Sequence, residues 1–244
     1  MTMRGAVMRS PLSAAVSLGV VAALGWPLVS VAQAVPTPPD QGAPSGRQRG
    51  GASRGDCMAY QDLAALVPVV DGNVWSQTSS PTPDFFFYIP QSLTADVPLE
   101  MVVQDSDDNY VFRQQFSVDA PAGILTVPIS SLGAELTPRE SYSWTFSIYC
   151  DAARPSASVA VFGTVTRVAD AVMPEPGPPL TPEQQFDLAR QYADAGIWHE
   201  ALALTLALHW ADPDNADYLA ALDNLLQQAG LADLAAVLVS EVPE

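Results

Sequence analysis

The spacing of Asp105, Asp107 and Asn109 matches the start of a calcium-binding loop. Such a loop supplies oxygen ligands at alternate positions, but it also requires a glycine at its sixth position and a bidentate glutamate at its twelfth. Tyr110 and Phe116 occupy those two positions in this chain. We therefore expect no metal site here and predict the polar tip of a β-hairpin instead.

The two histidines, His199 and His209, are the other side chains suited to acid–base chemistry or to metal binding. They stand ten residues apart in one predicted helix, nearly three turns from each other, which is too far for a shared metal ion. We expect His199 on the surface of that helix and His209 in packing near its end.

Motifs for nucleophilic or phosphoryl-transfer catalysis are missing from the sequence. It contains neither Gly-x-Ser-x-Gly nor a phosphate-binding loop, and no histidine lies near a candidate nucleophile. Acidic residues are abundant, so two carboxylates that meet only in space, as in glycoside hydrolases, stay an open alternative. We predict a protein that is not an enzyme, with no catalytic residues, no metal and no cofactor.

The charge of the chain restricts its partners further. Its 244 residues include 27 acidic and 10 basic side chains, a formal net charge of −17, and every basic residue is an arginine. A surface of this sign repels nucleic-acid phosphates, so we expect no nucleic-acid partner. Solubility is the simplest explanation of the acidity.

The N-terminus predicts the compartment. Residues 1–34 have the pattern of a secretory signal peptide, with early arginines, an apolar run from Leu12 to Val31, and the small-x-small sequence Ala32-Gln33-Ala34. The alternative is an uncleaved membrane anchor; Pro27 and the cleavage site argue against it. We predict cleavage after Ala34, export to the periplasm or the outside of the cell, and no stable membrane anchor afterwards.

An exported chain with two cysteines favours a disulfide, and two cysteines are too few for a zinc cluster. Cys150 ends the stretch Tyr142–Cys150, in which Tyr142, Trp144, Phe146, Ile148 and Cys150 alternate with polar residues, as in a strand buried on one face. We predict a bond from Cys57 to Cys150 that ties the start of the folded region to a late strand.

Residues 35–56 are rich in proline, glycine and polar residues, and we expect a flexible linker. Its arginines, Arg47, Arg49 and Arg54, have three possible roles: contact with an anionic partner, a solvated tether, or contact with the acidic domain.

Residues 57–170 contain seven or so short apolar runs separated by turn residues, which predicts a β-sandwich with an immunoglobulin-like architecture. The run Phe85–Tyr88 does not alternate, so both faces of that strand must be covered. We expect the helices that follow to cover one of them.

A proline-rich linker at residues 171–182 precedes a helical periodicity over residues 183–244. Thr181 and Pro182 are suited to start the first helix, and three more are expected at about Trp198–Trp210, Asn215–Gln228 and Leu231–Val239. Gly196 and Gly230 are 34 residues apart, and this period resembles the tetratricopeptide repeat. Two copies need a neighbour, so we expect these helical hairpins to dock on the sandwich.

Five blocks of the sequence together resemble the bacterial family called domain of unknown function 928. These blocks are Arg49–Cys57, Leu63–Pro68, Phe85–Pro90, Tyr142–Phe146 and Gly196–Leu202. The resemblance covers nearly everything after the signal peptide. It implies an architecture but no catalytic residues, because the family has no established activity.

The sequence therefore predicts an α+β protein, a β-sandwich followed by about four short helices. The function we expect is that of a non-catalytic, exported module that binds a protein or cell-envelope partner. The alternative is a glycan-binding module, or a carboxylate-dependent glycan hydrolase, on the sandwich.

Overall fold

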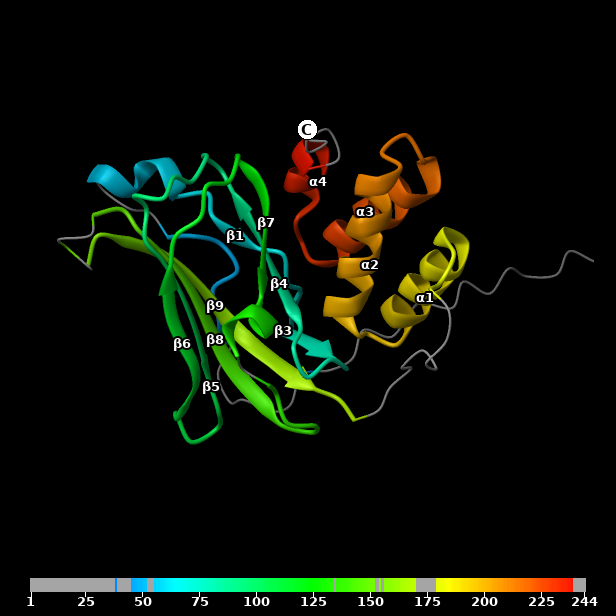
Figure 1. The fold of residues 1–244 in the computed structure, drawn as a ribbon, viewed down its shortest axis with the longest axis horizontal. Coiled ribbons are helices and arrows are strands. Elements are labelled where there is room, and N and C mark those ends of the chain that lie inside the picture. Colours follow the sequence, from blue (N-terminus) through cyan, green and yellow to red (C-terminus); the bar gives the residue numbers. More distant parts are fainter. Residues whose placement is uncertain are drawn as a thin grey trace, which may run out of the picture. The chain divides into compact units, whose positions relative to one another are not determined.

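The computed structural model describes residues 38, 45–51, 55–133, 135–151, 154, 156–169 and 179–238. The predicted signal peptide and its cleavage site after Ala34 lie outside these residues, as does most of the predicted linker 171–182. The described part is a mixed α+β structure in which nine strands in two sheets are followed by four helices (Figure 1).

The two sheets differ in size: one has six strands in the order β2-β3-β9-β8-β5-β6, and the other has three in the order β1-β4-β7. The strands are β1 (Ala64–Ala65), β2 (Val69–Val70), β3 (Asn73–Thr78), β4 (Asp84–Ile89), β5 (Leu99–Gln104), β6 (Tyr110–Phe116), β7 (Gly123–Pro128), β8 (Ser141–Tyr149) and β9 (Ser158–Arg167). Two short 3-10 helices, η1 (Gly55–Tyr60) and η2 (Ile129–Leu132), complete this region.

This arrangement does not confirm the expected immunoglobulin-like sandwich, whose sheets are antiparallel and have three and four strands in the simplest form. Here β3 and β9 pair in parallel, while the other strand pairs are antiparallel. A parallel pair needs a long connection, and all of β4 to β8 lies between these two strands.

The four helices of the described part are α1 (Pro182–Asp194), α2 (Trp198–Ala211), α3 (Ala216–Gln228) and α4 (Ala232–Leu238). A capping box starts α1, because the Thr181 hydroxyl accepts from the Gln184 amide while the Gln184 side chain accepts from the Thr181 amide. The helix bounds agree with the expected ones to within one residue. None of these helices has the length and apolar character that crossing a membrane requires.

One hydrophobic core lies between the two sheets, and the aromatic residues of β4 and β8 meet in it. The rings of Phe87 and Phe146 stack with centroids 4.0 Å apart, and Phe85 contacts Trp144 at 5.7 Å. In β8, Tyr142, Trp144, Phe146 and Ile148 are buried, as the alternation predicts.

The other face of β4 is covered by the helices. Phe86 is buried in a second core together with Ala64, Leu66 and side chains of α2 and α3. The prediction that helices cover this strand is thereby confirmed. In Figure 1, β1, β4 and β7 stand between the larger sheet and the helices, so the described structure has three layers.

Residues 45–51, called the N-terminal segment below, are bonded to the folded domain, whereas the sequence predicted that they belong to a flexible linker. Arg47 pairs with Phe162 of β9, and Arg49 pairs with Ala64 of β1. The segment therefore lies along one strand from each sheet. Backbone hydrogen bonds hold it, so its polar composition gave no sign of this placement.

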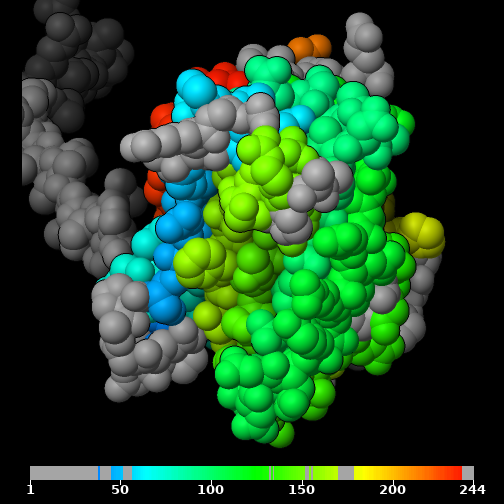
Figure 2. Space-filling view, turned by 90° about the vertical axis from the view of Figure 1, so that its left-hand side faces the viewer, coloured from blue at the N-terminus to red at the C-terminus, as the bar shows by residue number. Residues whose placement is uncertain are grey.

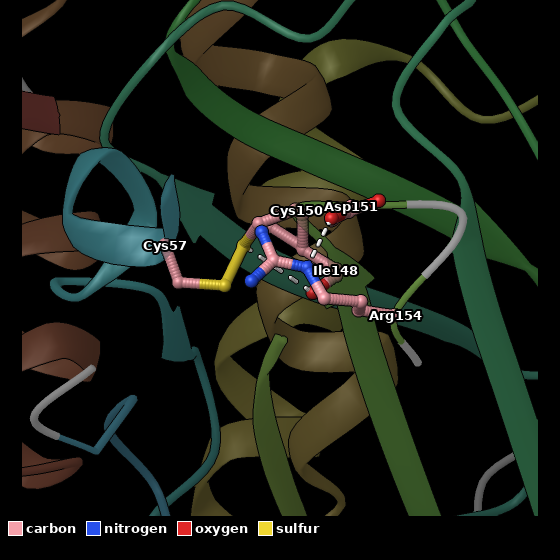
Figure 3. The surroundings of a disulfide bond; sticks show 5 residues. All are labelled: Cys57, Ile148, Cys150, Asp151 and Arg154. Carbon is pink, nitrogen blue, oxygen red and sulfur yellow. Dashed lines mark hydrogen bonds and ion pairs between the residues drawn. A yellow bond between two sulfur atoms is a disulfide. The ribbon is translucent and has the colours of Figure 1, made fainter. Parts of the chain in front are cut away.

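The predicted disulfide is present: Cys57 in η1 is bonded to Cys150, directly after β8, with Cα atoms 5.2 Å apart (Figure 3). Cys57 is buried and joins the core between the sheets. The bond therefore ties the start of the folded region to the end of the late strand β8, as expected.

Candidate functional site

Three consecutive residues in the first turn of α2 hold the helical layer on the sheets. Successive side chains of a helix point about 100° apart, so neighbours in one turn reach different elements. Trp198 donates from its indole nitrogen to the carbonyl oxygen of Leu66 at 2.7 Å. His199 and Glu200 bond to residues on or after β3 and β4. We call this set of contacts the α2 junction.

His199 is buried, so the expectation that it lies on the helix surface was wrong. Its Nδ1 lies 2.8 Å from the carbonyl oxygen of Asp84, which can only accept, so Nδ1 carries the proton. Nε2 therefore accepts from the hydroxyl of Ser76 at 2.9 Å. Burial lowers the pKa of His199, opposed by its bond to the Asp84 carbonyl and by the nearby carboxylates. His209 is also buried, as expected.

The Ser76–His199 contact has the distance of a serine nucleophile and its base, and the sequence did not reveal it because the two residues are 123 positions apart. Two features separate it from a catalytic pair. Ser76 is only 2% exposed, and the group behind Nδ1 is a main-chain carbonyl rather than a carboxylate. In this arrangement a substrate cannot reach the hydroxyl, and the pair serves to dock α2.

Glu200 binds the chain that follows β3. Its Oε1 accepts from the Thr78 hydroxyl at 2.6 Å and from the amides of Ser79 and Ser80 at 3.0 and 2.8 Å. Its Oε2 is buried and has no hydrogen-bond partner in the described structure. The sequence analysis did not single out this residue.

A small pocket adjoins Glu200, with a volume of about 130 Å³ and Asp84 in its wall. Burial raises the pKa of Asp84; His199 lowers it, and Glu200 raises it further. Glu200 and Asp84 are thus two carboxylates that meet in space. The alternative of a glycan-cleaving site also required an aromatic lining, and His199 is the only aromatic residue among those that line this pocket.

A larger groove, of about 540 Å³, runs between α1 and α3. The small side chains of Ala189, Ala193, Ala220 and Ala221 leave the space for it. Its charged lining consists of Arg190, Asp194 and Asp217. We call it the α1–α3 groove.

The charge around this groove is negative. Residues 179–238 include nine acidic side chains and one basic side chain, Arg190. The acidic ones are Glu183, Asp187, Asp194, Glu200, Asp212, Asp214, Asp217, Asp223 and Asp233. The helical layer therefore carries a large share of the net negative charge of the protein.

Figure 2 looks onto the outer face of the six-stranded sheet, which carries exposed aromatic rings and arginines. Strand register places Phe162, Thr145, Val102 and Arg113 in one row across it, and Arg47 extends the row at one end. In Figure 2 the N-terminal segment, in blue, lies beside β9, in lime green. The Arg47 guanidinium stacks over the ring of Phe162 at 5.8 Å.

A polar cluster adjoins this row. Glu100 is nearly buried and accepts from Arg113 at 3.0 Å and from the Tyr149 hydroxyl at 2.8 Å. Burial, followed by the bond to Glu100, raises the pKa of Tyr149. Tyr110 is 59% exposed, and the Arg113 guanidinium lies 5.4 Å from the centre of its ring.

The hairpin between β5 and β6 is present, with Asp105, Asp107 and Asn109 at its tip. Asp105 accepts from the amides of Asp107 and Asn109, so its carboxylate closes the turn, and the hydrogen bonds from Asn109 lower its pKa. Within the described residues, no group of three or more acidic, histidine or cysteine side chains is placed to hold a metal ion.

Fold and surfaces together define a class of α+β proteins in which a short helical array docks on a two-sheet domain. The family model described as Domain of Unknown Function (DUF928) matches residues 49–239, and the chain belongs to this family. The match starts inside the N-terminal segment and reaches past α4, so it spans all three layers. A search of curated proteins found no match.

Proposed function

We propose that this protein is an exported, non-catalytic binding module whose α1–α3 groove receives a basic segment of a protein or cell-envelope partner. The observation that carries the proposal is the groove itself, an open space of about 540 Å³ in a layer with nine acidic residues and one arginine. Charge complementarity favours a cationic occupant and speeds its encounter.

The way the helical layer is docked supports this use of the groove. The α2 junction directs Trp198, His199 and Glu200 toward the sheets, so this side of α2 is already occupied. Asp217 is exposed, and so is Arg190, which lies 3.8 Å from Asp187. A bound segment can therefore reach charged side chains without any rearrangement of the core.

Export is part of the proposal and rests on two observations. The first 34 residues have the signal-peptide pattern, and disulfides such as Cys57–Cys150 persist in oxidising compartments. Detection of the chain, cleaved after Ala34, outside the cytoplasm would support export. A full-length chain kept inside the cytoplasm would contradict it.

The groove is tested with two labelled peptides of equal length, one rich in arginine and one rich in glutamate, in fluorescence polarisation titrations. The arginine-rich peptide should bind and the glutamate-rich one should not. The double variant Asp194→Asn/Asp217→Asn should weaken binding by about tenfold, the equivalent of about 1.4 kcal/mol.

The matched control is Asp212→Asn/Asp214→Asn, which removes the same charge from the turn between α2 and α3, outside the groove lining. It should change the affinity far less. Equal losses in both double variants would show attraction by net charge alone and would contradict a specific groove site.

A second candidate function is glycan binding on the outer face of the six-stranded sheet. The exposed rings of Tyr110 and Phe162 favour it, because aromatic faces with polar neighbours suit sugar rings. A glycan bound by the protein should be lost in Tyr110→Ala and Phe162→Ala but kept in the groove variant. Binding that survives both sheet substitutions would exclude this face.

A further inference from the structure

Two pairs of an arginine and an aromatic ring lie on the outer face of the six-stranded sheet, the face shown in Figure 2. The Arg47 guanidinium lies 5.8 Å from the centre of the Phe162 ring, and the Arg113 guanidinium lies 5.4 Å from that of Tyr110. Phe162 is 38% exposed, and Arg47, Arg113 and Tyr110 are exposed as well. Each pair therefore presents an apolar ring beside a flat group of N–H donors.

The register of the sheet separates the two pairs by three strand spacings. Phe162 on β9 and Arg113 on β6 lie in one row, with Thr145 of β8 and Val102 of β5 between them. Neighbouring strands are about 4.8 Å apart, so these two positions are about 14 Å apart. Ser143, two residues from Thr145 on the same face, is exposed. The surface between the pairs is thus open, and an extended ligand of several units can reach both.

The charge on this face is opposite in sign to that of the whole chain, which carries −17. Among the described strand positions on this face, the charged side chains are Glu100 and Arg113, which pair at 3.0 Å. Arg47 adds a positive charge, and it forms no ion pair within the described part of the chain. Charge complementarity therefore favours an anionic ligand here.

The structure also separates the roles that the sequence left open for the linker arginines. Arg49 contacts the acidic helical layer through Asp233. Arg47 is instead held beside β9 by two backbone hydrogen bonds with Phe162, of 2.7 and 2.9 Å, while its side chain lies over the ring. Its guanidinium is thus positioned on the outer face before any ligand arrives. Arg54 lies outside the described residues.

We infer that this face binds a carboxylated polysaccharide, a chain of uronic acid units that lies across the strands from Arg47 to Arg113. The inference rests on the second candidate function above, glycan binding on this face, and adds the charge and the direction of the glycan. A guanidinium matches a carboxylate through two parallel hydrogen bonds. The apolar faces of sugar rings pack on the exposed rings of Phe162 and Tyr110.

The environment of Arg113 agrees with this direction. Its Nε donates to Glu100 and its Nη1 to the Tyr110 hydroxyl, which leaves Nη2 to donate to a ligand. Asp107 and Asp108 are exposed at the hairpin tip, where β5 and β6 end. These acids repel an anionic chain that runs along the two strands, so a path across the strands is favoured.

The test is isothermal titration calorimetry of the purified chain with a hexamer of galacturonic acid. The comparison ligand is the same hexamer with its carboxyl groups reduced to alcohols, which should bind at least about tenfold more weakly. Binding of the acidic hexamer should weaken as salt is added, because the contacts are between exposed charges. The acidic dimer should also bind at least about tenfold more weakly, since it reaches one pair only.

Arg47→Met is the decisive variant, because methionine keeps an apolar stem over Phe162 while the guanidinium is lost. Its affinity for the acidic hexamer should fall about tenfold. Ser143→Glu places a like charge beside the row and should weaken binding as much, whereas Ser143→Ala should not. The matched control is Arg190→Met: Arg190 lies over the ring of Phe186 at 5.9 Å, but on α1, and its loss should leave the affinity for the hexamer unchanged.

Equal binding of the acidic and the reduced hexamer would overturn the inference and leave glycan binding on this face intact. No binding of either hexamer would overturn both. An equal loss in Arg190→Met would show attraction by arginine in general and would overturn the placement. Vesicles that contain phosphatidylglycerol form the last arm, and binding to them without binding to the acidic hexamer would assign the face to an anionic membrane instead. The α1–α3 groove variant Asp194→Asn/Asp217→Asn should not weaken binding of the hexamer, so the groove proposal is tested separately.

Discussion

The imidazole of His199 joins two strands that belong to different sheets. Ser76 lies on β3 of the six-stranded sheet, and the carbonyl that accepts from Nδ1 belongs to Asp84 on β4 of the three-stranded sheet. Phe85 also contacts the ring edge-on, with centroids 4.9 Å apart. One side chain from the helical layer therefore fixes the relation of all three layers.

A double-mutant cycle measures this link. His199→Phe leaves the Ser76 hydroxyl and the Asp84 carbonyl without their partner, and Ser76→Ala leaves Nε2 without a donor. Each single substitution should lower the free energy of unfolding by about 1–3 kcal/mol in urea titrations. The double variant should lose less than the sum, because both changes remove the same hydrogen bond.

The control for this cycle is Ser143→Ala, an exposed position on the outer face of β8. Combined with His199→Phe, it should give an additive loss. Additivity for Ser76 and His199 as well would mean that their hydrogen bond contributes nothing to the docking of α2.

The histidines also predict how stability depends on pH. Burial lowers the pKa of both His199 and His209 in the folded state. Below the ordinary histidine pKa of about 6.5, the unfolded chain gains protons that the folded chain does not bind. Stability should therefore fall as the pH drops from above 6.5 toward 5, measured by urea unfolding at several pH values.

His209→Leu separates the two contributions. Both ring nitrogens of His209 are buried without a partner in the described structure, so leucine should be tolerated at neutral pH and should weaken the acid dependence. An acid dependence that is unchanged in this variant would assign the loss of stability at low pH to His199. Asp84 acts in the opposite sense, since its raised pKa favours the folded state at low pH and that contribution is lost as the pH rises from about 4.

At this scale, the sequence predicted the burial of His209 but not that of His199. The sequence does contain a sign that His199 is buried. The segment Trp198–Ala211 is apolar around most of its circumference, and such a helix is covered by other elements on several sides. A histidine within it is then expected to be buried and bonded. The residues that hydrogen-bond His199 could not be predicted, because no local pattern in the sequence relates position 199 to position 76.

At the scale of the elements, the backbone of the N-terminal segment packs closely against the neighbouring chain at Gly50. A Cβ atom added to Gly50 would lie 2.6 Å from the carbonyl oxygen of Gln61 and 2.7 Å from Val159. The Gly50 amide also donates to the carbonyl of Leu63 at 2.6 Å. Only glycine allows this approach both to the chain just before β1 and to β9.

Gly50→Ala should therefore push the segment away from the sheets, at a cost of about 1–3 kcal/mol. Trypsin cleavage after Arg47 and Arg49 reports on this displacement and should become faster. Gly51→Ala is the matched control, because its Cβ would meet only the end of the Arg47 side chain, which can move. Equal cleavage of the two variants would show that the contact at Gly50 does not hold the segment.

Most elements followed from periodicity and turn residues. The alternation in β8, the hairpin of β5 and β6, and the helix bounds set by Thr181, Gly196 and Gly230 were all readable in this way. The N-terminal segment was not, because a strand paired through its backbone needs no apolar side chains. The parallel pairing of β3 with β9 was not predicted either, since nothing in a single strand encodes its neighbour.

At the scale of the whole molecule, the disulfide closes a long loop. Cys57 and Cys150 are 93 residues apart, and the chain-entropy account gives about 4–5 kcal/mol for a loop of this length. The double variant Cys57→Ala/Cys150→Ala should therefore unfold at a much lower urea concentration. A reducing agent should destabilise the natural chain by a similar amount and leave the variant unaffected. Two free thiols in the unreduced, unfolded protein would contradict the bond.

The side chain of Gln48 donates to the carbonyl oxygens of Val67 and of Ala229, both at 2.6 Å, and the neighbouring Arg49 forms an ion pair with Asp233. The contacts with Ala229 and Asp233 join residues that are 181 and 184 positions apart. A ribosome makes the N-terminal segment well before the α3–α4 turn, so the bond from Gln48 to Ala229 can form only after the 181 residues that follow Gln48 have been made. Closing so large a loop is slow, and this step therefore belongs at the end of assembly, when the last helical hairpin arrives and locks the first residues of the domain in place.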